Sequence, residues 1–154
     1  MDATTRAVGE KTMTAKEYLN QVRRNRLHCQ ILDERIKELK AQAQGLKAIV
    51  YDKDRVQVSP TNKLEEYTVK IVALEDKQSK ALWKFDELEE TIRRQVMQMP
   101  SDTHREILTL RYIKSETDGR RITFERIACI MHKSFDWVRH AHGQALREFE
   151  RRYL

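Results

Sequence analysis

Hydrogen-bonding side chains and a flat aromatic ring stand together within the short stretch 135–140. Asp136 could accept from a cytosine amino group, Arg139 could donate to guanine or to a phosphate, and His140 could do either. The ring of Phe135 could contact a thymine methyl group. We therefore predict these four residues as contacts to DNA bases.

Cations and a hydroxyl flank this stretch on both sides. Such groups contact phosphate oxygens, and these contacts position a protein on nucleic acid without reading its sequence. For Arg147 the alternative of an ordinary solvated helix face stays open. The predicted phosphate contacts are Arg120, Arg121, Lys133, Ser134 and Arg147.

Residues 124–146 have the pattern of two helices joined by a tight turn, and this element would position the predicted contacts. Ala128 is small where the second helix must cross closely. Ser134 suits the N-cap of that helix, because its hydroxyl can accept a backbone N–H. In a helix-turn-helix the start of the second helix enters the major groove of DNA. The second helix is predicted to bury Val138, Ala141 or His142, Ala145 and Phe149.

An ordinary helical hairpin inside a protein core is the alternative interpretation of the same pattern. In that case Phe135 and Trp137 would pack against a helix at 101–113 or against a coiled coil, and they would not face DNA.

Residues 127–146 resemble, without a gap, the last helical region of bacterial sigma factors, which reads the upstream promoter element. The match includes an Ile-Ala pair, the Ser134 cap, Val138, Arg139 and an Ala-Leu pair, and REILTLRYI at 105–113 resembles the preceding helix. Sigma factors usually carry charged residues where this chain has Phe135 and Trp137. The resemblance therefore implies a DNA-binding domain with a different target sequence.

The composition predicts an all-α protein of one to two small domains. Charged residues make up 35% of the 154 residues and apolar residues 40%, with only 4 Gly and 2 Pro, which favours long charged helices over sheets. The net charge of +6 permits nucleic-acid binding without requiring it.

Two heptad patterns predict a long antiparallel helical hairpin, a coiled coil, over residues 14–100. Each helix spans about 37 residues, with apolar residues at alternating steps of four and three. Thr14 with Glu17, and Asn62 with Glu65, are predicted N-terminal caps. Residues 1–13 are predicted to be disordered, 51–61 to be a plain loop, and 101–154 to form the helix-turn-helix domain.

Several apolar residues of the second long helix lie off its heptad seam. A single hairpin would leave them exposed, which predicts a homo-oligomer formed through the hairpin. These residues are Val69, Val72, Leu82, Trp83 and Val96.

Over about residues 14–154 the chain also resembles a family of small late transcriptional regulators of phages and prophages of Gram-positive bacteria, the ArpU and RinA type. The helix with AKEYLNQVRR, the segment YDKDRVQVSP, the second long helix and the sigma-like end carry this resemblance. It implies control of late phage genes, with host RNA polymerase as a further partner. The alternatives are a DNA-recognition subunit of a phage packaging machine and a coiled-coil adaptor that binds no DNA.

Catalytic, cofactor and metal chemistry have no support in the sequence, so we expect no enzyme and no cofactor. Glycine-rich phosphate loops and nucleophile motifs are absent, and His140 and His142 lie too far apart around a helix to share an ion. Two cysteines and no long apolar run predict a cytoplasmic protein with no membrane partner, and the resemblance to phage regulators implies a bacterial host cell.

Overall fold

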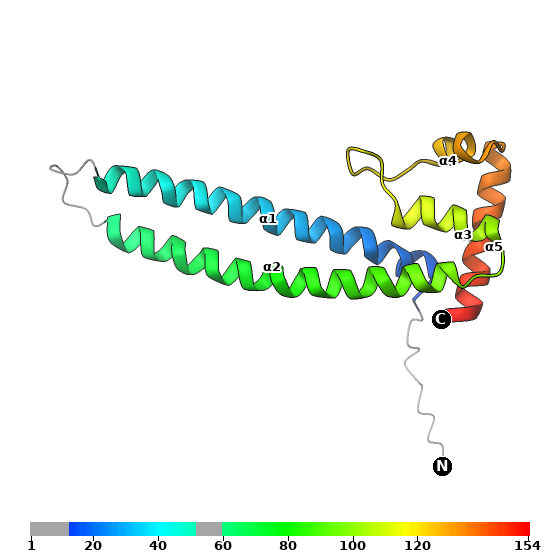
Figure 1. The fold of residues 1–154 in the computed structure, drawn as a ribbon, viewed down its shortest axis with the longest axis horizontal. Coiled ribbons are helices and arrows are strands. Elements are labelled where there is room, and N and C mark those ends of the chain that lie inside the picture. Colours follow the sequence, from blue (N-terminus) through cyan, green and yellow to red (C-terminus); the bar gives the residue numbers. More distant parts are fainter. Residues whose placement is uncertain (1–12, 52–59) are drawn as a thin grey trace, which may run out of the picture. The chain divides into compact units, whose positions relative to one another are not determined.

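The computed structural model describes residues 13–51 and 60–154, and these residues form helices without any strand. The all-α prediction is therefore confirmed for them, whereas the predictions for 1–12 and 52–59 lie outside the described residues. The elements are α1 (Ala15–Tyr51), α2 (Pro60–Met97), α3 (Asp102–Leu108), a π-helical turn (Thr109–Ile113), α4 (Phe124–Met131) and α5 (Phe135–Tyr153) (Figure 1).

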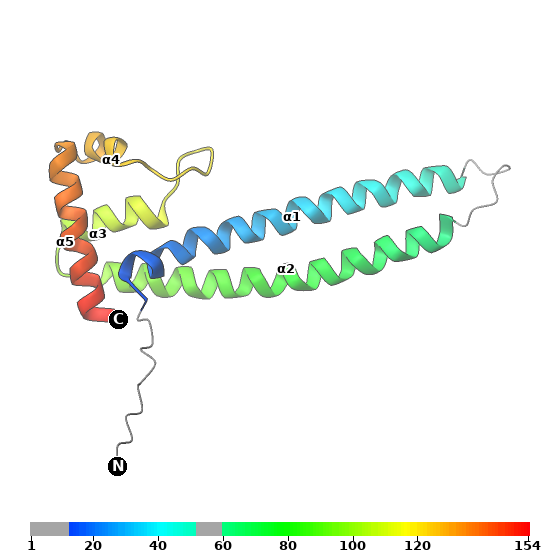
Figure 2. The ribbon, with the colours of Figure 1, turned by 180° about the vertical axis from the view of Figure 1, so that it is seen from behind.

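The two long helices α1 and α2 run side by side in opposite directions, as both views show (Figures 1 and 2). The chain divides into two compact units, of which the first contains residues 22–91 of this helix pair. Within it α1 buries a row of apolar residues at the predicted steps of three and four, and the predicted seam of α2 is half-buried. The buried row of α1 is Val22, Cys29, Leu32, Ile36, Leu39 and Ala43.

Polar pairs flank this seam and link the two helices. The Lys40 ammonium lies 2.7 Å from Glu75, and the Arg26 guanidinium lies 3.5 Å from Glu89. Such partly exposed pairs add little stability, so burial of the apolar row is the main contribution.

Of the two N-terminal caps predicted for the long helices, one is correct. The Thr14 backbone N–H donates to the Glu17 carboxylate at 3.0 Å, and the Thr14 hydroxyl accepts from the Glu17 N–H at 3.3 Å. The predicted cap at Asn62 is wrong, because α2 already begins at Pro60. Proline suits the first helical position, where its missing N–H would have no partner.

The second compact unit contains residues 92–154 and also the first turns of α1, up to residue 21. The Tyr18 ring lies 6.0 Å from that of Phe149 on α5, and the Tyr18 hydroxyl donates to Gln95 at 3.1 Å. The heptad patterns run unbroken through the ends of both long helices, so the sequence shows no boundary there. The buried apolar residues of this unit include Ala15, Leu19, Ile92, Val96, Met99, Ile107, Leu108 and Phe149.

The prediction that Val96 is exposed is wrong. Its side chain is fully buried, whereas Val69, Val72, Leu82 and Trp83 are exposed as predicted. Val96 lies in the compact unit formed with the C-terminal helices, where residues beside the seam also meet apolar neighbours.

The predicted inner face of residues 124–131 forms a small apolar cluster. Ile127 and Ala128 of α4 are buried with Val138 of α5, and Phe124 and Met131 pack against them. Leu110 and Ile122 complete the cluster. The predicted inward position of Ala128, in a cluster with Val138 of the second helix, is thus confirmed.

Val138 should be sensitive to substitution, since its side chain has no exposed surface. We expect Val138→Ala to lower the free energy of unfolding by about 2 kcal/mol, because it leaves a cavity. Val138→Asp should cost more, because it buries a carboxylate without a partner. Trp137 fluorescence during urea unfolding, in a Trp83→Phe background, measures both changes. Ile130→Ala is the control, since Ile130 is 40% exposed, and an equal loss there would contradict the assignment.

Candidate nucleic-acid interface

The turn between α4 and α5 is built by local hydrogen bonds. The chain leaves α4 at His132, which has a left-handed backbone (φ 53°), and the Lys133 N–H donates to the Ala128 carbonyl at 3.0 Å. The Ser134 hydroxyl then accepts from the Trp137 N–H at 3.2 Å and caps α5. The predicted helix, turn, cap and second helix are therefore present, although the turn contains no glycine.

The first two turns of α5 expose the residues predicted to contact bases. Asp136, Arg139 and His140 are exposed, as is Phe135. On the opposite side α5 buries Val138, Ala141, Ala145 and Phe149, so the predicted register is confirmed. The sequence left Ala141 and His142 as alternatives, and the structure buries Ala141 and leaves His142 half-buried.

Two aromatic side chains at the start of α5 face outward beside cations. Phe135 and Trp137 are each 38% exposed. The Lys133 ammonium lies 5.2 Å from the Trp137 ring centre, and the Arg139 guanidinium lies 5.7 Å from that of Phe135. Neither ring is buried in a core, and each keeps part of its surface open. Rings of this kind remain available to a partner.

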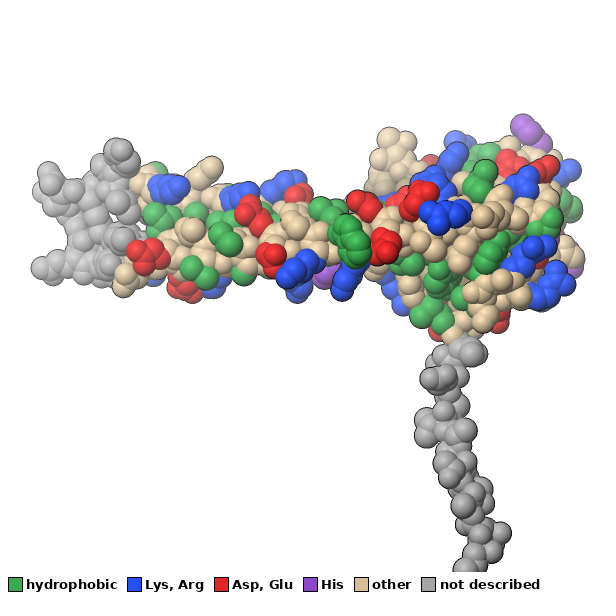
Figure 3. All heavy atoms as spheres, turned by 60° about the horizontal axis from the view of Figure 1, so that its bottom comes forward, with side chains coloured by type: hydrophobic (Ala, Val, Ile, Leu, Met, Phe, Trp, Pro, Cys, Tyr) green, Lys and Arg blue, Asp and Glu red, His purple; other side chains and the backbone are tan. Residues whose placement is uncertain are grey.

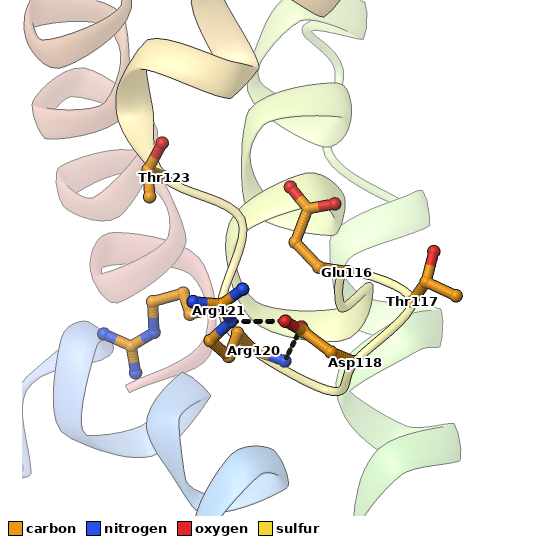
Figure 4. A pocket seen from close by; sticks show the side chains of 6 residues that line it. All are labelled: Glu116, Thr117, Asp118, Arg120, Arg121 and Thr123. Atoms are coloured by element: carbon orange, nitrogen blue, oxygen red, sulfur yellow. Dashed lines mark hydrogen bonds and ion pairs between the residues drawn. The ribbon is translucent and has the colours of Figure 1, made fainter.

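The predicted phosphate contacts differ in their surroundings. Lys133, Ser134 and Arg147 are exposed on or beside α5. Arg120 lies in the loop before α4, where its guanidinium contacts the Asp118 carboxylate and its backbone N–H donates to the same group at 3.0 Å (Figure 4). These hydrogen bonds lower the pKa of Asp118. Much of the charge of Arg120 is therefore balanced locally.

Arg121 differs from its neighbour Arg120. Its guanidinium donates to the Asn20 amide oxygen of α1 at 2.5 Å. It also lines a pocket of about 260 Å³ in the same compact unit, formed between α1, the π-helical turn and α5. The four cations of this pocket are Lys16, Arg111, Arg121 and Arg139, and its rings are those of Tyr112, Phe124 and His142.

The wall of this pocket is held by contacts that the sequence did not reveal. Arg111 donates to the Ile122 carbonyl at 2.7 Å, and its guanidinium lies 4.2 Å from the centre of the Phe124 ring. The Tyr112 hydroxyl lies 3.0 Å from His142 Nε2. Sequence patterns treated the segment containing Arg111 and Tyr112 only as a helix, because contacts with residues 10 to 30 positions away leave no periodic signal.

His142 is held in its neutral form inside this wall. Burial, and then the positive charges of Arg111, Lys16 and Arg121, lower its pKa from 6.5 to about 4. A neutral ring can accept a hydrogen bond from the Tyr112 hydroxyl, whose own pKa is raised by burial.

Metal and membrane sites find no support in the part of the chain that the structure describes. No three His, Cys, Asp or Glu side chains gather there as a metal site would need. No helix among the residues described combines the length and the apolar character needed to cross a membrane. Comparison with known proteins gives no match to a family model, a curated protein or a solved structure.

The pKa of His142 predicts a loss of stability at mildly acidic pH. The unfolded chain takes up this proton near pH 6.5 and the folded chain only near 4, so stability should fall as the pH drops from about 6.5 toward about 4. His142→Gln keeps a polar group but cannot titrate, and its melting temperature should change less between pH 7 and 5. Thermal melting of both proteins by circular dichroism tests this. Equal pH dependence of the two would contradict it.

Proposed function

We propose that this protein is a sequence-specific DNA-binding regulator of transcription and not an enzyme. The observation that carries the proposal is the exposure of the first two turns of α5, which Ser134 caps directly after the tight turn that follows α4. A helix presented in this way can enter the major groove, where base edges carry a distinct pattern of donors and acceptors.

The side chains of α5 suit two kinds of contact in this proposal. The exposed side chains of Asp136, His140 and Phe135 would contact base edges. Lys133 and Arg147 stand where they could meet phosphates, and the Ser134 hydroxyl can still donate while its oxygen caps the helix. Arg120 is the weakest of the predicted phosphate contacts, because Asp118 already pairs with it.

The resemblance to late phage regulators supports the biological setting of this proposal. It implies late phage genes in a bacterial host as the target and RNA polymerase as a second partner. A protein-binding adaptor is the second candidate function. The partly exposed apolar side chains of Ile130, Phe135 and Trp137 around the turn favour it, since such a cluster also suits a protein partner.

The logarithm of the affinity for duplex DNA should fall linearly with the logarithm of the salt concentration. The slope should be about 0.9 for each phosphate contact. Lys133→Ala should lower this slope by about 0.9 and weaken binding to all DNA sequences alike. Asp136→Ala should instead relax the preference at one base pair, by ~1–3 kcal/mol. Fluorescence anisotropy with labelled duplexes measures both effects.

Lys80→Ala is the matched control for this experiment, because Lys80 is an exposed lysine on α2. It should bind like the wild type. An affinity that does not respond to salt, or no binding of any duplex selected from phage DNA, would favour the adaptor function instead.

A second copy of the chain is the partner that we propose for the exposed apolar side chains of the helix pair. Val69, Val72 and Trp83 are each at least 60% exposed and lie within about 60° of one another around α2. Figure 3 shows hydrophobic side chains among the charged ones along this pair. A dimer would carry two recognition helices for two half-sites of DNA.

We expect Trp83→Glu to shift the protein from dimer to monomer, because it places a charge in the apolar contact. Its binding to a two-half-site duplex should weaken while a single half-site is bound as before. Sedimentation velocity measures the oligomeric state. Lys84→Glu is the control, since it adds the same acidic group about 100° around α2. A wild type that is monomeric with and without DNA would rule out self-association.

A further inference from the structure

The pocket of about 260 Å³ that Arg139 and His142 of α5 help to line, here called the pocket at the base of α5, gathers four cations. Lys16, Arg111, Arg121 and Arg139 line it, and none of its described lining residues is acidic. Arg120, in the same unit, lies beside the Asp118 carboxylate instead. A cluster of four cations favours an anionic ligand.

The effect of these charges reaches the interior of the pocket. Burial lowers the pKa of His142 most, and the charges of Arg111, Lys16 and Arg121 lower it further. Tyr112 feels Arg111 and Arg121 in the same way, although burial raises its pKa overall. The electrostatic potential inside the pocket is therefore positive, which is the condition that an anion requires.

Two of the guanidinium groups are held in place before any ligand arrives. Arg111 is fixed by the Ile122 carbonyl at 2.7 Å and by the Phe124 ring, and Arg121 by Asn20 at 2.5 Å. The π-helical turn brings the consecutive residues Arg111 and Tyr112 to the same pocket. Groups that are already ordered lose less entropy when they bind.

The donors of the pocket match phosphate oxygens. Guanidinium groups form paired hydrogen bonds to phosphate, and a lysine adds a point charge. The pocket volume of about 260 Å³ leaves room for a phosphate group. A smaller carboxylate would leave donors of the pocket unused.

We propose that this pocket binds a phosphate group and that the group is one phosphodiester of the DNA backbone. Arg139 then contacts phosphate, where the sequence left base and phosphate open. Lys16 extends the DNA contact to the first turn of α1. The inference rests on the proposed function, since it assigns a further contact to the same DNA-binding face.

Arg139→Ala and Lys16→Ala test the assignment, because both side chains are exposed and their loss leaves the core intact. Each should lower the salt slope of DNA binding, and the double variant should lower it by no more than about 0.9, because both side chains contact the same phosphate. Arg139→Lys should keep the wild-type slope, since it keeps the charge. The preferred sequence should be the same in all variants. Arg151→Ala, an exposed arginine further along α5, should bind like the wild type.

A second measurement uses inorganic phosphate without DNA. Phosphate should shift the side-chain NMR signals of His142 in the wild type and raise the pKa of His142, because an anion offsets the neighbouring cations. Acetate at the same ionic strength should shift these signals less. In Arg139→Ala the response to phosphate should be weakened.

The outcomes separate this inference from the proposed function. DNA binding with unchanged slopes in Arg139→Ala and Lys16→Ala would overturn the inference and leave the proposed function standing. A changed base preference in Arg139→Ala would overturn it too, because Arg139 would then read a base. If His142 responds to phosphate but no duplex binds, the pocket takes a free phosphorylated ligand and both proposals about DNA are wrong. A stronger response to acetate than to phosphate would point to acidic protein side chains and overturn the phosphate assignment.

Discussion

Burial of one face of α5 is the constraint on which the C-terminal unit depends. At its start Val138 enters the cluster of Ile127 and Ala128, and near its end Phe149 meets Tyr18 of α1. Both side chains have no exposed surface. A helix has only one way to satisfy both contacts, so its rotation about its own axis is fixed.

This rotation decides which residues α5 presents to a partner. With Val138 inward, the neighbouring residues Asp136 and Arg139 must lie elsewhere around the helix, and both are exposed. The Ser134 cap and the left-handed residue His132 then set where the helix begins. The proposed recognition surface is therefore a consequence of core packing, and changes to the core would alter it without touching any surface residue.

Two sets of cations in this unit differ in whether a carboxylate lies beside them. Arg120 is balanced by Asp118, and Arg152 lies 3.4 Å from Glu148. The cations of the pocket at the base of α5 have no carboxylate in the wall beside them, and they help keep His142 neutral. Exposed ion pairs add little stability, whereas a cluster of cations around a pocket favours the binding of an anion. Net charge alone would not distinguish these two kinds.

The local features of this protein follow from its sequence. Helix periodicity predicted the seam of α1, the buried face of α5 and the outward direction of Asp136 and His140, because each depends only on residues within a few turns. The cap at Thr14 was predictable for the same reason, since Glu17 lies three residues away. The cap at Asn62 was not, because Pro60 supplied an earlier start for α2.

Tertiary structure decided what distant segments do together. Lys16 meets Arg111 and Arg139 in one pocket although more than 90 residues separate it from the nearer of the two. The burial of Val96 and the hydrogen bond between Tyr112 and His142 likewise depend on how helices pack. Periodicity determines which face of a helix is apolar, but the partner for that face depends on the angle and depth at which two helices meet. That geometry is set by the fit of many side chains at once, so only the folded chain contains it.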